Sequence, residues 1–277
     1  MSTIVSEVQT IDNELMFNLN DVDVSIVNGL RRVCLSNINT LVFRGFPHSE
    51  NKINIEKNTT KFNNEYLKHR IQCIPIHNND TRTFENYKRQ YAVKLHEVNK
   101  TMNKVYITTQ DFEIIEKESG NVLPNSKDLV ANLFPVDPIS GDGILIMILM
   151  PHYNKAEKPD EINMVLEFDI GHAKQNNCWN VVKKSVFENV QDPDKVQKKL
   201  EEMNEPDPVK RRDFELLDAQ REYIDNKYKF TVATLGGYTN SEIVKMGCEY
   251  IIERFNRLDS EMDSTTTIVE KTDVDDL

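Results

Sequence analysis

Residue types and motifs that mark many enzymes are scarce in this sequence. Its 277 residues include only 9 glycines, and these never cluster into a phosphate-binding loop. Neither an H-E-x-x-H pattern nor a paired-Asp metal signature is present, and the 6 histidines and single tryptophan are scattered. We therefore predict no catalytic residue and no cofactor in this chain.

Cysteine is also rare. The 4 cysteines, Cys34, Cys73, Cys178 and Cys248, never form the C-x-x-C pairs that a structural zinc site needs. We expect no metal, and we expect the cysteines to be buried small hydrophobic residues.

Long apolar runs are missing as well. The first residues, MSTIVSEVQTIDNELMF, contain neither a basic nor an apolar signal region, which predicts an intracellular protein. The longest apolar stretch, at residues 144–150, is far shorter than the roughly 20 residues that span a bilayer. It predicts a buried strand, and no membrane contact is expected.

Acidic side chains outnumber basic ones, 45 to 34. The formal net charge of −11 disfavours broad direct contact with a phosphate backbone. With 39% hydrophobic and 29% charged residues, the chain is expected to fold into one or two globular domains.

Apolar spacing predicts how the chain begins. Alternating polarity over the first 20 residues indicates two strands joined by a turn at Asp12-Asn13. The next segment, residues 24–38, has the spacing of a helix with Asp21 or Asp23 as N-cap. Its apolar stripe consists of Val27, Leu30, Cys34 and Ile38.

The remainder is predicted to be mainly strands, followed by a last helix. Strands are expected at residues 40–46, 52–57, 91–98, 104–109, 144–150, 163–170 and 228–235, with a short helix near residues 65–70. Residues 192–223 indicate a loop and a charged surface helix. Thr239 and Glu242 have the spacing of a capping box. The helix that follows has an apolar face broad enough to be buried on more than one side. This face includes Val244, Ile251, Phe255 and Leu258.

Three segments in this order carry a family resemblance. Residues 27–38 resemble the N-x-L-R-R-x-x-L-x-x-I helix of RNA polymerase alpha-like subunits. Residues 64–76 are similar to the D-E-x-x-x-H-R-x-x-x-I-P-L segment of that family, with Asn64 in place of Asp and Cys73 in place of Leu. The closing strand, turn and helix resemble its F-x-V-E-T-x-G-x-x-x-x-E-I-V ending, with Ala233 in place of Glu. A looser match at residues 171–180 resembles the G-x-x-x-x-H-A-K-W segment of the eukaryotic third subunit and its archaeal counterpart.

The chain departs from some relatives in two ways. Residues 76–93 lack the cysteine cluster that many archaeal and some eukaryotic relatives carry. Only about nineteen residues follow Leu258, too few for the DNA-binding domain of the bacterial subunit. These departures favour the eukaryotic, archaeal or viral type, and the Asn- and Lys-rich composition favours a large DNA virus.

The resemblance implies an α+β fold, with a sheet and two packed helices interrupted by a mostly β insert. The dimerisation domain is expected at residues 1–56 and 222–277, with residues 259–277 as a disordered acidic tail. The insert domain is expected at residues 57–221. The implied function is a non-catalytic assembly subunit that pairs with a second alpha-like subunit and binds the largest and second-largest subunits. DNA would be contacted only through the complex, in the nucleus, or in host cytoplasm and virion for a virus.

The resemblance also implies a role for each motif. The residues expected to contact the catalytic subunits are Asn28, Arg31, Arg32, Glu65, His69 and Arg70. The residues expected to act in dimerisation are Val27, Leu30, Cys34, Ile38, Val244, Ile251, Phe255 and Leu258. Each role has an ordinary alternative. Arg31 and Arg32 could be solvent-exposed helix charges, and Glu65 and His69 could form only a local pair. The last helix could pack only on its own sheet.

Two rival functions come from other classes. One is a free-standing transcription regulator that uses the same fold, and the other is an independent enzyme with its site in the divergent insert. Copurification with two very large chains would favour the polymerase subunit over both.

Overall fold

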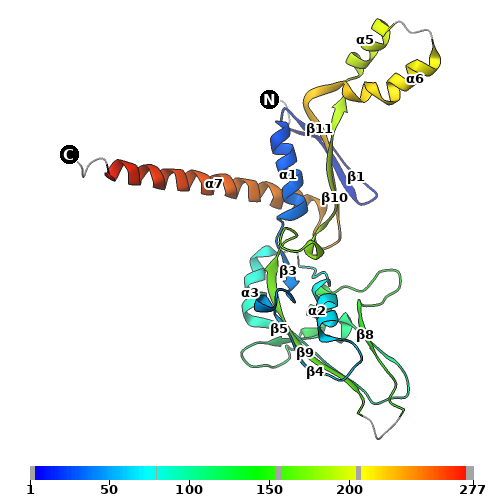
Figure 1. The fold of residues 1–277 in the computed structure, drawn as a ribbon, viewed down its shortest axis with the longest axis vertical. Helices are drawn as coiled ribbons and strands as arrows, with labels where there is room; N and C mark the ends of the chain where they lie inside the picture. Colours follow the sequence, from blue (N-terminus) through cyan, green and yellow to red (C-terminus); the bar gives the residue numbers. More distant parts are fainter. Residues whose placement is uncertain (1–3, 79, 154–157, 204–206, 273–277) are drawn as a thin grey trace. The chain divides into compact units, whose positions relative to one another are not determined.

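A computed structural model describes residues 4–78, 80–153, 158–203 and 207–272, with only the backbone described for residues 263–272. The chain forms two compact units. Unit 1 comprises Met1–Ile38, Val182–Leu235 and Thr239–Leu277, and unit 2 comprises Asn39–Val181 and Gly236–Tyr238. Figure 1 traces both units along the chain.

Unit 1 is a four-stranded antiparallel sheet with helices. Its strands lie in the order β1-β2-β11-β10, with bounds β1 (Val5–Ile11), β2 (Glu14–Asn20), β11 (Tyr223–Thr234) and β10 (Val182–Gln191). Its helices are α1 (Val24–Ser36), α5 (Pro193–Met203), α6 (Pro208–Leu216), the 3-10 helix η5 (Asp218–Arg221) and α7 (Asn240–Thr272). The positive φ angles of Asp12 (49°) and Asn13 (64°) form the turn that the sequence predicted between β1 and β2.

The apolar face of this sheet follows from alternation in its two central strands. Phe17 of β2 lies opposite Phe230 of β11, and their rings stack with centroids 5.4 Å apart. Leu19 lies opposite Tyr228, and all four side chains are buried. Cross-strand aromatic pairs of this kind hold the register of the sheet.

Helices α1 and α7 pack against each other in unit 1. Asp23 caps α1 by accepting a hydrogen bond from the Ser25 amide at 2.8 Å. The predicted capping box of α7 is confirmed, because Glu242 accepts from the Thr239 amide at 2.8 Å and Thr239 Oγ1 accepts from the Glu242 amide at 3.3 Å. Each bond satisfies an amide that the first helical turn leaves without a partner.

Gly247 is the point of closest approach between the two helices. A Cβ atom there would lie 2.9 Å from Leu30 Cδ1 and 3.0 Å from Cys34 Sγ. One turn away on either side, Cys34 Sγ lies 3.9 Å from the Ile243 carbonyl, and Asn37 donates to the Tyr250 hydroxyl at 2.9 Å. The absent side chain therefore lets the α7 backbone rest on the side chains of α1.

Unit 2 is built around antiparallel sheets. One sheet has the order β3-β9-β5-β7, with β4 also paired to β9, and β6 pairs with β8. The strands are β3 (Thr40–Phe43), β4 (Ile53–Asn58), β5 (Tyr91–Asn99), β6 (Val105–Thr108), β7 (Glu113–Glu116), β8 (Leu145–Leu149) and β9 (Asp160–Gly171). The helices are η1 (His48–Glu50), α2 (Asn64–Gln72), η2 (Thr81–Thr83), α3 (Phe84–Gln90), η3 (Thr109–Asp111), α4 (Ser126–Leu133) and η4 (Asn177–Trp179).

An aromatic cluster forms the centre of unit 2. The ring of Phe43 lies 5.5 Å from that of Phe168, 6.0 Å from Phe134 and 6.4 Å from Phe112. All four side chains are buried, and they come from segments far apart in the sequence. Burial of large aromatic side chains is the main favourable contribution to such a core.

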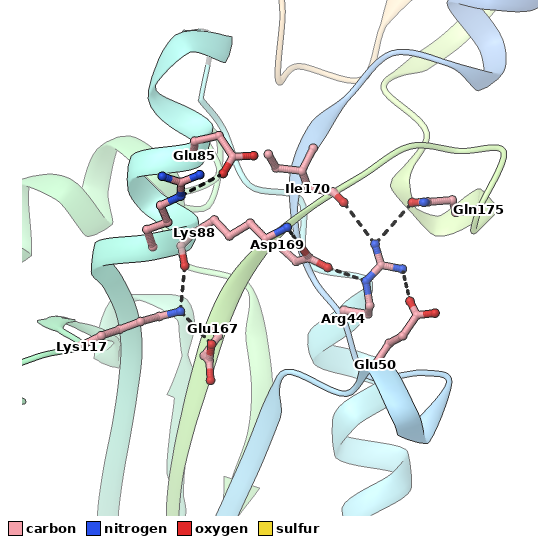
Figure 2. Close-up of polar contacts among 10 residues, drawn as sticks. Arg44, Glu50, Glu85, Lys88, Lys117, Glu167, Asp169, Ile170 and Gln175 are labelled. Atoms are coloured by element: carbon pink, nitrogen blue, oxygen red, sulfur yellow. Dashed lines mark hydrogen bonds and ion pairs between the residues drawn. The ribbon is translucent and has the colours of Figure 1, made fainter.

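A buried arginine follows directly after β3 (Figure 2). Arg44 Nε donates to Asp169 Oδ2 at 2.6 Å, and Lys88 Nζ lies 2.9 Å from the other oxygen of that carboxylate. The guanidinium also contacts Glu50 at 3.2 Å and lies 4.8 Å from the Trp179 ring. Only 8% of the Arg44 side chain and 11% of the Asp169 side chain are exposed, so both charges depend on these partners.

The unit boundaries differ from those predicted at residues 56/57 and 221/222. Strands β3 and β4 pair with β9, which places residues 39–56 in unit 2. Strand β10 pairs with β11, which places residues 182–221 in unit 1. The α+β class and the sheet with two packed helices are confirmed.

The segment predicted to be a disordered tail differs in the structure, where residues 259–272 continue α7, while residues 273–277 lie outside the described residues. Among the described helices none is long and apolar enough to span a bilayer.

Asp169→Asn should lower the free energy of unfolding at pH 7 by about 3 kcal/mol, because it leaves the buried charge of Arg44 without its closest partner. Burial pushes the pKa of Asp169 upward, but hydrogen bonds from Lys88 and Arg44 hold it below its ordinary value. The carboxylate's stabilisation is therefore present above about pH 4 and lost as the pH falls through the folded pKa. Denaturation at several pH values should show the variant and the parent converging in acid.

Glu167→Gln is the matched control for this measurement, because Glu167 also pairs with a lysine, Lys117 at 2.7 Å, but its side chain is 43% exposed. We expect a loss of about 1 kcal/mol or less. Equal losses in the two variants would contradict a special role for the buried pair.

Gly247→Leu should destabilise unit 1 by about 1–3 kcal/mol, because the new side chain overlaps Leu30 and Cys34. Gly29→Ala on α1 is the control, since nothing lies within 4 Å of a Cβ atom there. Removing a helical glycine without a clash should stabilise the protein by about 0.5–1 kcal/mol. Thermal unfolding of both variants measures these changes. A Gly247→Leu variant more stable than the parent protein would disprove the close approach of the two helices.

Candidate subunit interface

The last helix has two apolar stripes with different surroundings. Ile243, Gly247 and Tyr250 recur at helical spacing and contact α1. One residue further along, a second stripe runs down α7 and turns away from α1. Figure 1 shows α7 crossing α1 and continuing beyond it.

We call the second stripe the outer α7 face. Its exposed members are Ile252 (58% exposed), Phe255 (63%), Leu258 (53%) and Met262 (61%). Ile251 and Val244 lie on the same side of the helix and are half-buried. Four large apolar side chains exposed along one helix face form a patch typical of a protein interface.

The predicted dimerisation residues separate into two groups. Val27, Leu30, Cys34 and Ile38 are buried within the chain. Of the α7 residues that were predicted to dimerise, only Phe255 and Leu258 are well exposed. The buried group therefore offers no exposed surface to a partner in this chain.

Sequence reasoning missed Ile252 and Met262. Both extend the helical spacing of Phe255 and Leu258, and Met262 lies in the part of α7 that was predicted to be a disordered tail. Following the period into the acidic segment would have found them.

Helix α1 presents polar and apolar groups on its outer side. Arg31 donates from Nε and Nη2 to Asn28 Oδ1, at 3.0 and 2.9 Å. Arg32, Val24 and Ile26 are exposed. Among the described residues no carboxylate lies within ion-pair distance of Arg31 or Arg32. The local bond to Asn28 thus orients the Arg31 guanidinium while leaving its charge uncompensated.

The predicted interface residues of helix α2 differ in their exposure and contacts. Glu65 and His69 are exposed. Arg70 donates to the carbonyl oxygens of Ile146 at 2.9 Å and Leu145 at 2.8 Å, so it fastens α2 to β8 within unit 2. Its predicted contact with a catalytic subunit stays a prediction, and its visible role is structural.

The prediction that all cysteines are buried was wrong for three of them. Cys34 is buried, whereas Cys73, Cys178 and Cys248 are exposed. Within the described ranges no cluster of three or more His, Cys, Asp or Glu side chains is arranged to hold a metal ion.

Unit 2 also contains a hollow of about 640 Å³ lined by both polar and apolar residues, which bears on the rival enzyme function. Glu97, Asp111 and Glu113 line it, and burial, with Asp111 nearby, raises the pKa of Glu97. A cluster of carboxylates alone does not define a reaction, and this hollow carries no functional argument.

A family match agrees with the arrangement of α1 and α7. The sequence matches the family described as the RNA polymerase Rpb3/Rpb11 dimerisation domain over residues 16–255. The match runs from within β2 to Phe255 on the outer α7 face, and so includes α1 and the first part of α7. Because it covers most of the chain, the protein belongs to this family and is an alpha-like subunit of RNA polymerase.

Proposed function

We propose that the chain is a non-catalytic assembly subunit of a DNA-directed RNA polymerase, which pairs with a separate second alpha-like subunit and binds the two large catalytic subunits. The observation that carries the proposal is the outer α7 face, with four large apolar side chains each more than half exposed. The family description names dimerisation, and this face lies on α7, one of the two packed helices of unit 1.

The energetics favour a permanent partner for this face. Burying a large apolar side chain contributes about 1.5–3 kcal/mol, so covering four of them is worth several kcal/mol. Obligate interfaces bury large apolar surfaces and resemble a domain core cut in half. A second alpha-like subunit fits because it would bring an apolar helix pair of the same kind.

The polar side of α1 is proposed to bind a catalytic subunit. The planar guanidinium of Arg31, held by Asn28, can pair with a carboxylate of the partner through two parallel hydrogen bonds. Arg32 supplies a second exposed charge beside it. In unit 2, Glu65 and His69 offer a separate polar surface on α2 for the same purpose.

Polymerisation of ribonucleotides would then take place in the large subunits, and this chain would contact DNA only through the complex. The proposed location is intracellular, in the nucleus, or in host cytoplasm and virion if the source is a large DNA virus. Affinity purification of the full chain tests the whole proposal. Two very large chains and one small alpha-like chain in stoichiometric amounts support it, and a stable monomer contradicts it.

The double variant Phe255→Asp/Leu258→Asp should abolish pairing with the alpha-like partner. Two carboxylates placed in an apolar interface each carry a desolvation penalty of several kcal/mol, so affinity should fall by at least about 100-fold. Both residues are exposed in the chain, so the helix content by circular dichroism should not change. Co-expression and size-exclusion chromatography measure the pairing.

Leu216→Asp/Leu217→Asp is the matched control, because these residues at the end of α6 are also exposed, at 55% and 69%. Pairing should persist in this variant. Loss of pairing in the control, or retention in the α7 variant, would rule out the outer α7 face as the interface.

Arg31→Ala/Arg32→Ala should leave the alpha-like pair intact and weaken recruitment of a large subunit. The apolar contacts of α1 are untouched, and alanine favours helix. Losing one side of a buried charged contact costs about 2–5 kcal/mol, which corresponds to a roughly thirty-fold or greater loss of affinity. A pull-down at moderate salt measures the recruitment.

Arg211→Ala/Arg212→Ala removes two adjacent exposed arginines from α6 and controls for the change in net charge. It should recruit the large subunits normally. Equal recruitment by the two double variants would show that Arg31 and Arg32 are ordinary surface charges.

A further inference from the structure

Two of the exposed cysteines come together in unit 2 from distant parts of the sequence. Cys73 is the C-cap of α2, and Cys178 lies in the short helix η4. Cys178 Sγ lies 3.8 Å from the backbone oxygen of Gln72, the residue directly before Cys73, so the Cys178 thiol lies beside Cys73. Neither is part of the proposed interface on α1 and α7.

Gln72 holds the two segments in contact. Its side-chain nitrogen, Nε2, donates to Cys178 Sγ at 3.6 Å. Its backbone oxygen accepts from Trp179 Nε1 at 3.3 Å and from Cys178 Sγ at 3.8 Å. The side-chain oxygen of Gln72, Oε1, accepts a hydrogen bond from the Gly45 backbone amide at 3.1 Å. Gln72 is only 3% exposed, so these bonds fix the backbone beside both thiols.

The other two cysteines form a second pair with a different setting. Cys34 Sγ lies against Gly247, the residue directly before Cys248, in unit 1, but Cys34 is completely buried. Burial, helped by the neighbouring Cys248 thiol, raises the pKa of Cys34 to about 12. A reagent in solution therefore meets both thiols of the Cys73–Cys178 pair but only one of the Cys34–Cys248 pair.

We propose that Cys73 and Cys178 are a thiol–disulfide exchange site, which a low-molecular-weight disulfide such as oxidised glutathione converts to an intrachain disulfide. The Cys73 thiolate attacks one sulfur of the small disulfide, which gives a mixed disulfide and releases one small thiol. The Cys178 thiolate then attacks the Cys73 sulfur and releases the second.

The reaction balances without any further reagent. Two protein thiols are oxidised by two electrons, and the small disulfide is reduced to two thiols, which carry away the two protons. Cys73 reacts first because the Cys178 thiol donates to the backbone oxygen of Gln72 at 3.8 Å, a hydrogen bond that favours the protonated thiol. Burial also raises the pKa of the Cys178 thiol. A reducing thiol reverses both steps.

The disulfide would join the end of α2 to η4 across more than a hundred residues of sequence. Closing so long a loop restricts the unfolded chain and stabilises the folded one. It would also fasten α2, which presents Glu65 and His69, to the segment that carries Trp179. The site thus links the redox state of the surroundings to the rigidity of α2.

The test treats the full chain with oxidised glutathione at about pH 8.5 and maps disulfides by mass spectrometry of unreduced peptides. The peptides containing Cys73 and Cys178 should be found joined, and dithiothreitol should separate them. The melting temperature should rise by about 5 °C or more on oxidation. The Cys248→Ser variant is the matched control and should form the same cross-link.

Cys178→Ser should stop the reaction at its first step, which leaves a glutathione adduct on Cys73 and no rise in melting temperature. That trapped adduct supports the order of attack as well as the site. Separate glutathione adducts on Cys73 and Cys178 of the parent, or thiols that stay reduced, would overturn the proposal. A Cys34–Cys248 cross-link formed in preference to Cys73–Cys178 would overturn it too.

Discussion

The approach of α7 to α1 at Gly247 is the constraint on which the proposed interface depends. The missing side chain lets the α7 backbone lie against Leu30 and Cys34. This contact sets the rotation of α7 about its own axis, since Ile243, Gly247 and Tyr250 must then face α1. The residues one position further along are directed away from α1 as a result, and there the helix is apolar as well. A larger residue at position 247 would change both faces together.

A different kind of constraint holds unit 2 together. Its sheets bury charged and polar groups that only long-range partners can satisfy, as Arg44 does with Asp169 and Gln72 with Gly45. Such groups contribute little net stability compared with an apolar replacement, but they are costly to leave unpaired. They therefore specify which strands and helices meet. Because Gln72 bonds to both Gly45 and Trp179, α2 has one position in the unit.

The sequence predicted local features well and long-range features poorly. The α1 stripe, the Asp12-Asn13 turn and the α7 capping box depend on residues a few positions apart, and the structure contains all three. The first domain boundary depends on the pairing of β3 with β9, across more than a hundred residues, and the second on the pairing of β10 with β11 across the helices between them. No local pattern encodes either pairing. The exposure of Cys73 and Cys178 was missed for the same reason, because it follows from how distant segments meet. The length of α7 was underestimated because acidic composition was given more weight than helical period.

The arginines of the chain show why a motif alone cannot assign a role. Arg44 and Arg70 use their guanidinium groups within unit 2, Arg44 on Asp169 and Arg70 on Leu145, which are 125 and 75 residues away in sequence. Arg31 bonds instead to Asn28, three residues away, which orients the group without neutralising it. A chain with net charge −11 has many carboxylates available, yet within the described residues none is placed beside Arg31 or Arg32. An oriented cation that its own acidic chain does not pair is what the proposed contact with an acidic partner requires.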